Sequence, residues 1–197
     1  PRGERSHSLH IADAFIDAYR EKNPQDKVSV LNVFDADLPA FDGAAVEAKY
    51  AIMHGNDQNQ AQIQAWKTVE TFIEQFKSAD KYVLTCAMWN FAVPYRLKQY
   101  FDIIVQPGYT FSADENGYEG LLTDKKAALI YARGGEYSAD RSSYDMQKPY
   151  IELIMGFMGI TDIYSIVAEP TIAAEPDQRK SMMDESVRKA KELAEGF

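Results

Sequence analysis

The feature that most constrains the fold of this chain is a regular alternation between short apolar runs and longer stretches with helical periodicity. Such alternation is typical of a parallel sheet with helices on both faces. We therefore predict an α/β fold, a doubly wound parallel sheet in three α/β/α layers. The predicted strands are Val28–Phe34, Tyr82–Ala87, Lys126–Arg133 and Ile163–Ala168, and the predicted helices cover 9–19, 44–50, 63–76, 93–104, 150–158 and 176–194.

The start of the chain departs from this pattern. A doubly wound fold begins with a strand, whereas Pro1–Ser8 is polar and turn-like and leads directly into a helix. We expect the first strand to lie in residues upstream of Pro1; the alternative is a four-stranded sheet with an unusual edge. The length of 197 residues suits one domain covering residues 1–197.

The composition of the chain argues against nucleic acid and membranes as binding partners. The net charge of −9 argues against general affinity for nucleic acid. No apolar run approaches the ~20 residues of a membrane helix. The single cysteine, Cys86, excludes an intramolecular disulfide and is expected to be a small core residue rather than a nucleophile. We expect a cytoplasmic protein with no membrane or nucleic-acid partner.

An aromatic loop follows the predicted strand Tyr82–Ala87. It reads Met88-Trp89-Asn90-Phe91, and Pro94 then opens a helix. Ligands of open α/β sheets bind just beyond the carboxyl ends of strands, so we interpret this loop as one wall of a flat pocket for an aromatic ligand. The alternative is that Trp89 and Phe91 are ordinary core or interface residues.

Two other strand-end or helix-start segments suit a ligand. Ser6 and Ser8 are natural N-caps of the first helix, but with Arg2 and Arg5 they could also form an anion site for a phosphate. Gly134-Gly135 follows the strand ending at Arg133; the pair could be a simple turn, or could let backbone groups approach the polar edge of a planar ligand.

Several common motifs are missing from the sequence. It contains neither GxxxxGK[ST] nor GxGxxG, and no nucleophile–His–acid set is evident. His7 and His10, three residues apart on a helix, could in principle share a metal, but they have no evident third ligand and are better explained as solvated helix residues.

Several segments taken together resemble one family. They are PRGERSHS at the start of a helix, AMWNF followed by PxxLKxYFD, TFSADENGYEGLLTDKKA, ARGGEY and MGFMGITD. In order and spacing this set resembles the FMN-dependent NAD(P)H azoreductases and quinone reductases, which have a flavodoxin-like fold. The resemblance runs from Pro1 to about Asp162 and is looser over the last helix.

The resemblance implies a role for each of these segments. It places the FMN phosphate on Ser6, His7 and Ser8, and the polar edge of the flavin on the turn Arg133–Gly135. It places the flavin ring on Met88, Trp89, Asn90 and Phe91. The candidates for the substrate pocket are Phe111, Tyr137 and Phe157, with Tyr137 standing where some members carry histidine.

The resemblance also implies an activity. Members reduce quinones and azo compounds by ping-pong, two-electron hydride transfer, with NADH or NADPH as co-substrate and the chemistry on FMN rather than on a catalytic side chain. Members are homodimers, and the segments 35–59 and 109–118 are our candidates for that contact. Two other functions stay open at this point: a non-enzymatic flavodoxin-like electron carrier or redox sensor, and a phosphoester hydrolase using the Ser6–Ser8 loop.

Overall fold

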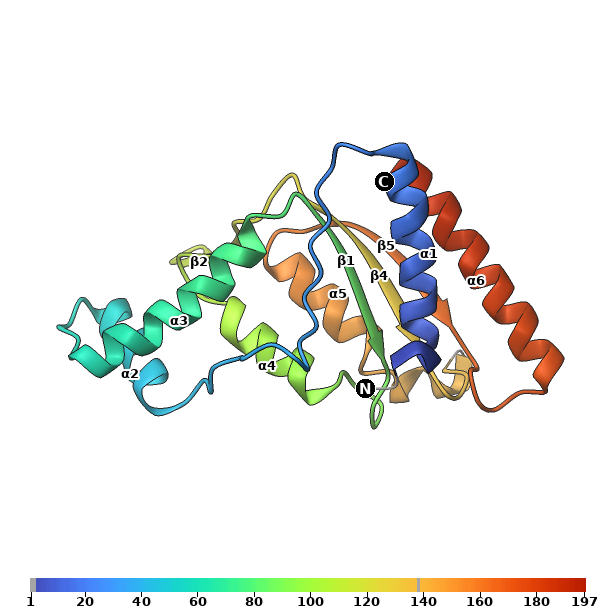
Figure 1. Cartoon of the computed structure of the whole chain (residues 1–197). Helices are drawn as coiled ribbons and strands as arrows, with labels where there is room; N and C mark the ends of the chain where they lie inside the picture. The colour runs from blue at the N-terminus through green and yellow to red at the C-terminus, as the bar shows by residue number, and fades with distance from the viewer. Residues whose placement is uncertain (1–2, 138) are drawn as a thin grey trace.

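A parallel sheet lies at the centre of the molecule (Figure 1). The computed structural model describes residues 3–137 and 139–197, and within them the sheet has the strand order β1-β4-β5. Its strands are β1 (Lys81–Ala87), β4 (Lys126–Ala132) and β5 (Asp162–Ala168). The helices are α1 (His7–Lys22), α2 (Gly43–His54), α3 (Gln60–Lys77), α4 (Tyr95–Ile104), α5 (Lys148–Phe157) and α6 (Pro176–Gly196), with 3-10 turns η1 (Gly3–Arg5) and η2 (Ala139–Tyr144).

Strand β4 is the core strand, and it divides the interior into two halves. Its side chains alternate between the two faces of the sheet, as they must in any strand. Ala128 and Ile130 pack with α1 and α6, whereas Leu129 and Tyr131 pack with α3, α4 and α5. The predicted α/β architecture with a helical layer on each face is therefore confirmed.

The helices begin and end largely where the sequence predicts. Ser6 is the N-cap of α1, and its hydroxyl accepts a hydrogen bond from the Leu9 amide at 3.4 Å. Pro176 is the first residue of α6, as expected for a residue without an amide donor. No helix in the described part of the chain is long and apolar enough to cross a membrane.

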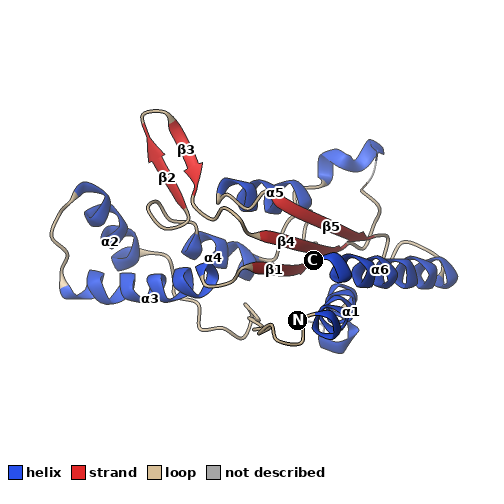
Figure 2. Cartoon of the chain, turned by 90° about the horizontal axis from the view of Figure 1, so that it is seen from above, coloured by secondary structure: helices blue, strands red, loops and turns tan. Residues whose placement is uncertain are grey.

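The predicted strand Val28–Phe34 is wrong. Figures 1 and 2 show this segment passing along the β1 side of the sheet, but among the described residues it joins no strand ladder. Its Val33 carbonyl accepts a hydrogen bond from the Arg96 side chain of α4 at 2.9 Å, and Val30 is 85% exposed. A β-branched run becomes a strand only when a neighbouring strand pairs with it, and none of the described strands does so.

A short apolar run such as Tyr82–Ala87 is typical of a strand buried on both faces, but β1 is not buried in this way. Only Cys86 is fully buried in β1, and its other residues are half-buried. The physical reason is position: among the described strands β1 pairs only with β4, so no described strand covers its other side. The strand that is buried along almost its entire length is β4.

A two-stranded hairpin extends from the main body (Figure 2). The turn signals in residues 106–125 predict loops, and the structure forms β2 (Phe111–Asp114) and β3 (Gly117–Gly120) there. The base of the hairpin rests on the end of α5, because the Leu122 amide donates to the Met158 carbonyl at 2.8 Å. At the same place a Cβ on Gly120 would lie 2.1 Å from the Gly159 nitrogen.

We expect Gly120→Ala to lower the free energy of unfolding by about 1–3 kcal/mol, because the added methyl group would push against backbone that cannot rotate away. Urea denaturation measures this. The matched control is Gly156→Ala in α5, where a Cβ would have no described neighbour within 4 Å, and which should stabilise by about 0.5–1 kcal/mol. Equal stability of the two variants would contradict the packing of the hairpin on α5.

Candidate functional site

The strands end in register at one edge of the sheet. Ala87, Ala132 and Ala168 are aligned across β1, β4 and β5. The pairing continues one step further, since the Met88 amide donates to the Ala132 carbonyl at 2.8 Å and the Arg133 amide to the Ala168 carbonyl at 3.0 Å. The loops that start at Met88 and Arg133 therefore leave the sheet side by side.

The loop after β1 is a tight reverse turn. Trp89 and Ala92 exchange two backbone hydrogen bonds, of 2.9 and 3.0 Å, around the two central residues Asn90 and Phe91. Both central residues have positive φ, 47° and 70°, as in a type I′ turn. Asparagine tolerates this conformation, but for a residue as bulky as phenylalanine it is strained.

Large aromatic side chains are displayed on this turn. Trp89 is 38% exposed and Phe91 50% exposed, so neither is a core residue. The Trp89 ring lies 5.6 Å from that of Phe34, whereas the Phe91 ring lies 6.2 Å from that of Tyr137. Exposed aromatic faces at the carboxyl edge of the sheet can stack on a planar ligand.

The glycine pair after β4 forms a fixed turn beside this loop. The Gly134 carbonyl accepts hydrogen bonds from the Ile172 and Ala173 amides, each at 3.0 Å. A Cβ on Gly134 would lie 3.3 Å from Ile172 Cδ1, and one on Gly135 would lie 3.6 Å from the Tyr137 ring. The contact at Gly134 would be tight against the end of a flexible side chain, whereas the contact at Gly135 is an ordinary van der Waals distance.

The Arg133 side chain points into the protein rather than toward the turn. Its guanidinium is 3% exposed and pairs with Asp145 at 2.7 Å and with Glu169 at 3.3 Å. Its Nε donates to Gln147 Oε1 at 3.0 Å. The described contacts of the Arg133 side chain are therefore with protein groups, and its role among the cofactor-binding residues stays a prediction.

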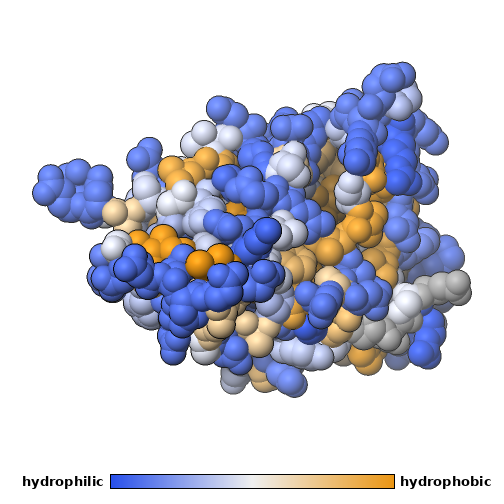
Figure 3. All heavy atoms as spheres, turned by 60° about the vertical axis from the view of Figure 1, so that its left-hand side comes forward, coloured by the Kyte–Doolittle hydropathy of each residue, from blue (hydrophilic) through white to orange (hydrophobic). Residues whose placement is uncertain are grey.

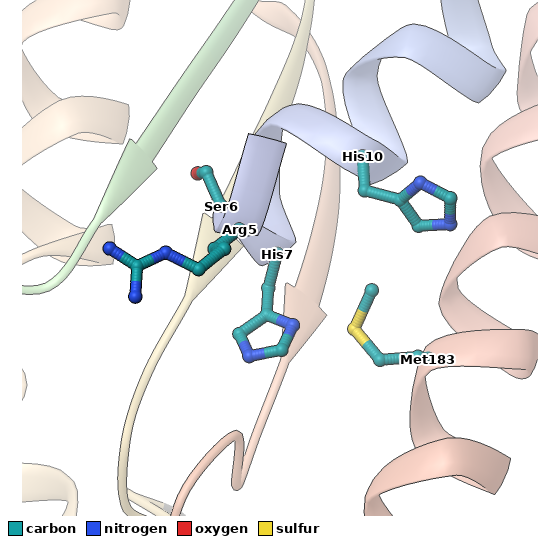
Figure 4. Close-up of a pocket in the computed structure, with 5 residues that line it drawn as sticks. All are labelled: Arg5, Ser6, His7, His10 and Met183. Carbon is teal, nitrogen blue, oxygen red and sulfur yellow. The ribbon is translucent and has the colours of Figure 1, made fainter. Parts of the chain in front are cut away.

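The start of α1 borders a pocket of about 250 Å³. Figure 4 shows Arg5 extending toward the β1 side, while His10 and Met183 lie on the side facing α6. Ser6 and His7 complete the lining of this pocket.

The chemistry of this pocket suits an anion. The N-terminus of a helix carries partial positive charge, and here the Arg5 guanidinium adds to it. Ser8, the third predicted phosphate ligand, is 4% exposed, and its hydroxyl lies 3.4 Å from that of Ser6, so it backs the pocket rather than lining it. Arg2 lies outside the described residues.

The three predicted substrate-pocket residues are not brought together within one chain. The Phe111 and Phe157 rings are 4.6 Å apart, but they belong to the hairpin and to the C-terminal end of α5, beside the start of the strands. Tyr137 lies beyond β4, at the carboxyl edge with Phe91. The two groups therefore lie at opposite ends of the strands.

Sequence reasoning missed several residues of the site. Phe34 packs on Trp89, and Tyr95 lies 5.9 Å from Phe34, because the extended segment before α2 passes beside the turn. The acceptors around Arg133 are also missed: an arginine directly after a buried strand was the available signal that carboxylates must surround it. Within the described residues, no cluster of His, Cys, Asp and Glu could hold a metal, and this includes His7 and His10.

We expect Cys86 to resist alkylation in the folded protein. Burial raises the pKa of its thiol from 9.0 to about 12, so no reactive thiolate forms near neutrality. Native protein at pH 8 should therefore label slowly with a maleimide, and urea-unfolded protein should label rapidly. Because the folded-state pKa is raised, the neutral thiol favours the folded state below pH 9, and this contribution is lost between pH 9 and 12.

The Cys86→Ala variant controls for labelling at other side chains, and it should remain unlabelled in both states. Labelling of the native protein at the rate of the unfolded protein would contradict the buried position of this thiol.

Comparison with known proteins agrees with this geometry. A family model described as "Flavodoxin-like fold" matches residues 1–194, so the chain belongs to this family. An FMN-dependent NADH:quinone oxidoreductase of Nitratidesulfovibrio vulgaris (strain DP4) is 53% identical over 199 residues, covering 100% of this chain and 95% of the relative.

Two solved structures are also similar. An azoreductase from Bacillus anthracis strain Sterne is 30% identical with a TM-score of 0.91, covering 98% of this chain and 93% of that one. An FMN-dependent NADH-azoreductase from the Ames Ancestor strain, crystallised in complex with FMN, is 26% identical with a TM-score of 0.85, covering 96% and 92%.

Proposed function

We infer that this protein is an FMN-dependent NADH oxidoreductase that reduces quinones and azo compounds. The observation that carries this conclusion is the arrangement at the carboxyl edge: an exposed aromatic turn, a glycine turn and, at the start of α1, a pocket suited to an anion. The relative with 53% identity over the full chain is named an FMN-dependent NADH:quinone oxidoreductase, and a similar solved structure is named an azoreductase.

The residues present fit FMN, which combines a flat ring system with a phosphate. Arg5, Ser6 and His7 would hold the phosphate. Met88–Phe91 would lie against the ring, with Gly134 and Gly135 at its polar edge. Ser8 and Arg133 support these groups from behind.

When bound, FMN supplies the chemistry, accepting hydride from NADH and passing two electrons to the acceptor. The protein's own groups bind and orient. Trp89 and Phe91 offer apolar faces for planar rings, and the Arg5 side chain would balance the charge of the phosphate. Because the cofactor would supply the chemistry and the protein would bind and orient it, no catalytic acid or base is needed among the site residues.

We also propose that the working form is a homodimer. Phe111 and Phe157 lie too far from the aromatic turn of their own chain to share a pocket with it, so they could serve as substrate-pocket residues only for a second copy. The segment 35–59, a candidate for the contact, exposes Tyr50, Ile52 and Met53 on α2 by 42–54%. Figure 3, with this side of the molecule forward, shows hydrophobic patches on its surface.

We place the protein in the cytoplasm, without nucleic-acid partners. Its lone cysteine is buried and unpaired with another, as suits a reducing compartment. Its net charge of −9 would repel a phosphate backbone.

The test is reconstitution with FMN followed by anaerobic addition of NADH. We expect the flavin absorption band to bleach, and then to return on addition of benzoquinone or of an azo dye. In air, steady-state NADH oxidation should depend on both FMN and quinone. Bound FMN that NADH fails to reduce would instead indicate an electron carrier, and release of phosphate from a phosphoester without flavin would indicate a hydrolase.

A further inference from the structure

We propose that Arg133 and Gln147 are positioning residues for the flavin-binding turn, which they hold through hydrogen bonds from the segment Asp145–Gln147. This inference rests on the proposed function, because it takes the turn Met88–Phe91 as the place where the flavin lies. It assigns a role to side chains whose described hydrogen bonds go to other protein groups.

The first step is the fixation of Asp145 and Gln147 by Arg133. The guanidinium donates to Asp145 Oδ2 at 2.7 Å and to Gln147 Oε1 at 3.0 Å. The other oxygen of Asp145 accepts from the amides of Gln147 and Lys148, at 3.0 and 3.1 Å, so the start of α5 is tied to the same group. Arg133 and Gln147 are almost completely buried, at 3% and 0% exposure.

The second step is the link from this segment to both ends of the turn. The Gln147 carboxamide donates to the Cys86 carbonyl at 3.1 Å and lies 3.1 Å from the Cys86 thiol, two residues before Met88. The neighbouring Met146 amide donates to the Phe91 carbonyl at 2.9 Å. Residues 146 and 147 therefore hold the turn where it leaves β1 and again at its second central residue.

The third step is the reason why the turn needs such support. Phe91 has φ of 70°, a conformation that costs a bulky residue energy and persists only where its surroundings impose it. The two backbone hydrogen bonds inside the turn join only Trp89 and Ala92, so they leave the Phe91 carbonyl without a partner inside the turn. Hydrogen bonds from residues 146 and 147 supply such a constraint from outside the turn.

The same guanidinium also acts on the second wall of the site. It pairs with Glu169 at 3.3 Å, and Glu169 in turn accepts a hydrogen bond from the Tyr137 amide at 3.1 Å. The Tyr137 ring faces both Gly135 and Phe91. One buried cation thus fixes the aromatic turn and the residues beyond the glycine pair relative to each other.

The test compares Gln147→Met with Gln106→Met. Both replace a fully buried glutamine by an apolar side chain of similar volume, but Gln106 donates to the Asp102 carbonyl of α4, away from the turn. FMN binding is measured from the quenching of flavin fluorescence, and folding from far-UV circular dichroism and Tm. We expect the FMN dissociation constant to rise at least tenfold in Gln147→Met and less than twofold in Gln106→Met, with similar losses of Tm.

A second variant, Arg133→Lys, covers the case in which Gln147→Met fails to fold. Lysine keeps the charge beside Asp145 and Glu169 but has no planar fork to hold Gln147 as well, so FMN binding should weaken by about fivefold or more. The visible circular dichroism of bound flavin should also change in either variant, because the ring loses its fixed environment.

The outcomes separate this inference from the proposed function. If the unaltered protein does not bind FMN, the proposed function itself fails, and the inference with it. If it binds FMN but Gln147→Met and Arg133→Lys bind equally well, or if Gln106→Met weakens binding as much as they do, the positioning role is overturned while the proposed function stands.

Discussion

Replacing Arg133 with methionine is expected to lower the free energy of unfolding by about 3–5 kcal/mol, the cost of removing one partner from a buried ion pair. The change leaves Asp145 and Glu169, 12% and 17% exposed, without their cation. It also leaves Gln147 Oε1 without its donor. Methionine fills much of the volume of the arginine side chain, so the loss of unfolding free energy measures mainly the lost electrostatic and hydrogen-bonding contacts. Urea denaturation with an unchanged m-value measures it.

The matched control is Arg188→Met on α6. Arg188 also contacts two carboxylates, Glu185 and Glu192, at 2.7 and 2.5 Å, but its side chain is 55% exposed. Water already solvates these charges well, so this variant should unfold at nearly the same urea concentration as the unaltered protein. Similar losses of unfolding free energy in both variants would show that burial does not increase the contribution of Arg133 to stability.

Reversing the charge of Arg5 is expected to weaken FMN binding on the order of 50-fold. The substitution Arg5→Glu exchanges a positive for a negative group beside the start of α1, next to a phosphate of about two negative charges. The comparison ligand is riboflavin, which has the same ring system without phosphate. Its dissociation constant should change by less than about threefold, because in the proposed binding mode Arg5 would face only the phosphate.

The control for this experiment is Arg20→Glu, an exposed residue in the last turn of the same helix. It changes the net charge by the same amount but lies about 20 Å along the helix from its start, beyond the screening length at physiological salt. FMN binding should therefore stay within about twofold. If Arg5→Glu and Arg20→Glu weakened FMN and riboflavin alike, the pocket at α1 would not be the phosphate site.

Local patterns in the sequence predict most of the fold. Each helix combines an apolar stripe with a start or stop signal, such as Ser6 before α1 or Pro176 in α6, and these signals act over a few residues. The run Val28–Phe34 shows the limit of such reasoning. Its composition is that of a strand, but whether it becomes one depends on a neighbouring strand far away in sequence.

The residues of the candidate site likewise fall into those that local sequence predicts and those that depend on distant contacts. Trp89 and Phe91 could be found from sequence because two aromatics directly after a strand are already unusual in a loop. The role of Arg133 could not, because its partners Asp145, Gln147 and Glu169 are 12 to 36 residues away and meet only in the folded chain. The positions of Phe111 and Phe157 relative to the turn could not be predicted either. They depend on how the hairpin and α5 are placed against the sheet, which local sequence patterns do not specify.

The measurement that tests this account most directly is a crystal structure of the protein grown with FMN. We expect the flavin ring to lie against Trp89 and Asn90 at the carboxyl edge of the sheet, with its phosphate at the pocket formed by Arg5, Ser6 and His7. A flavin bound elsewhere, or an FMN-saturated crystal in which this edge holds only solvent, would contradict it.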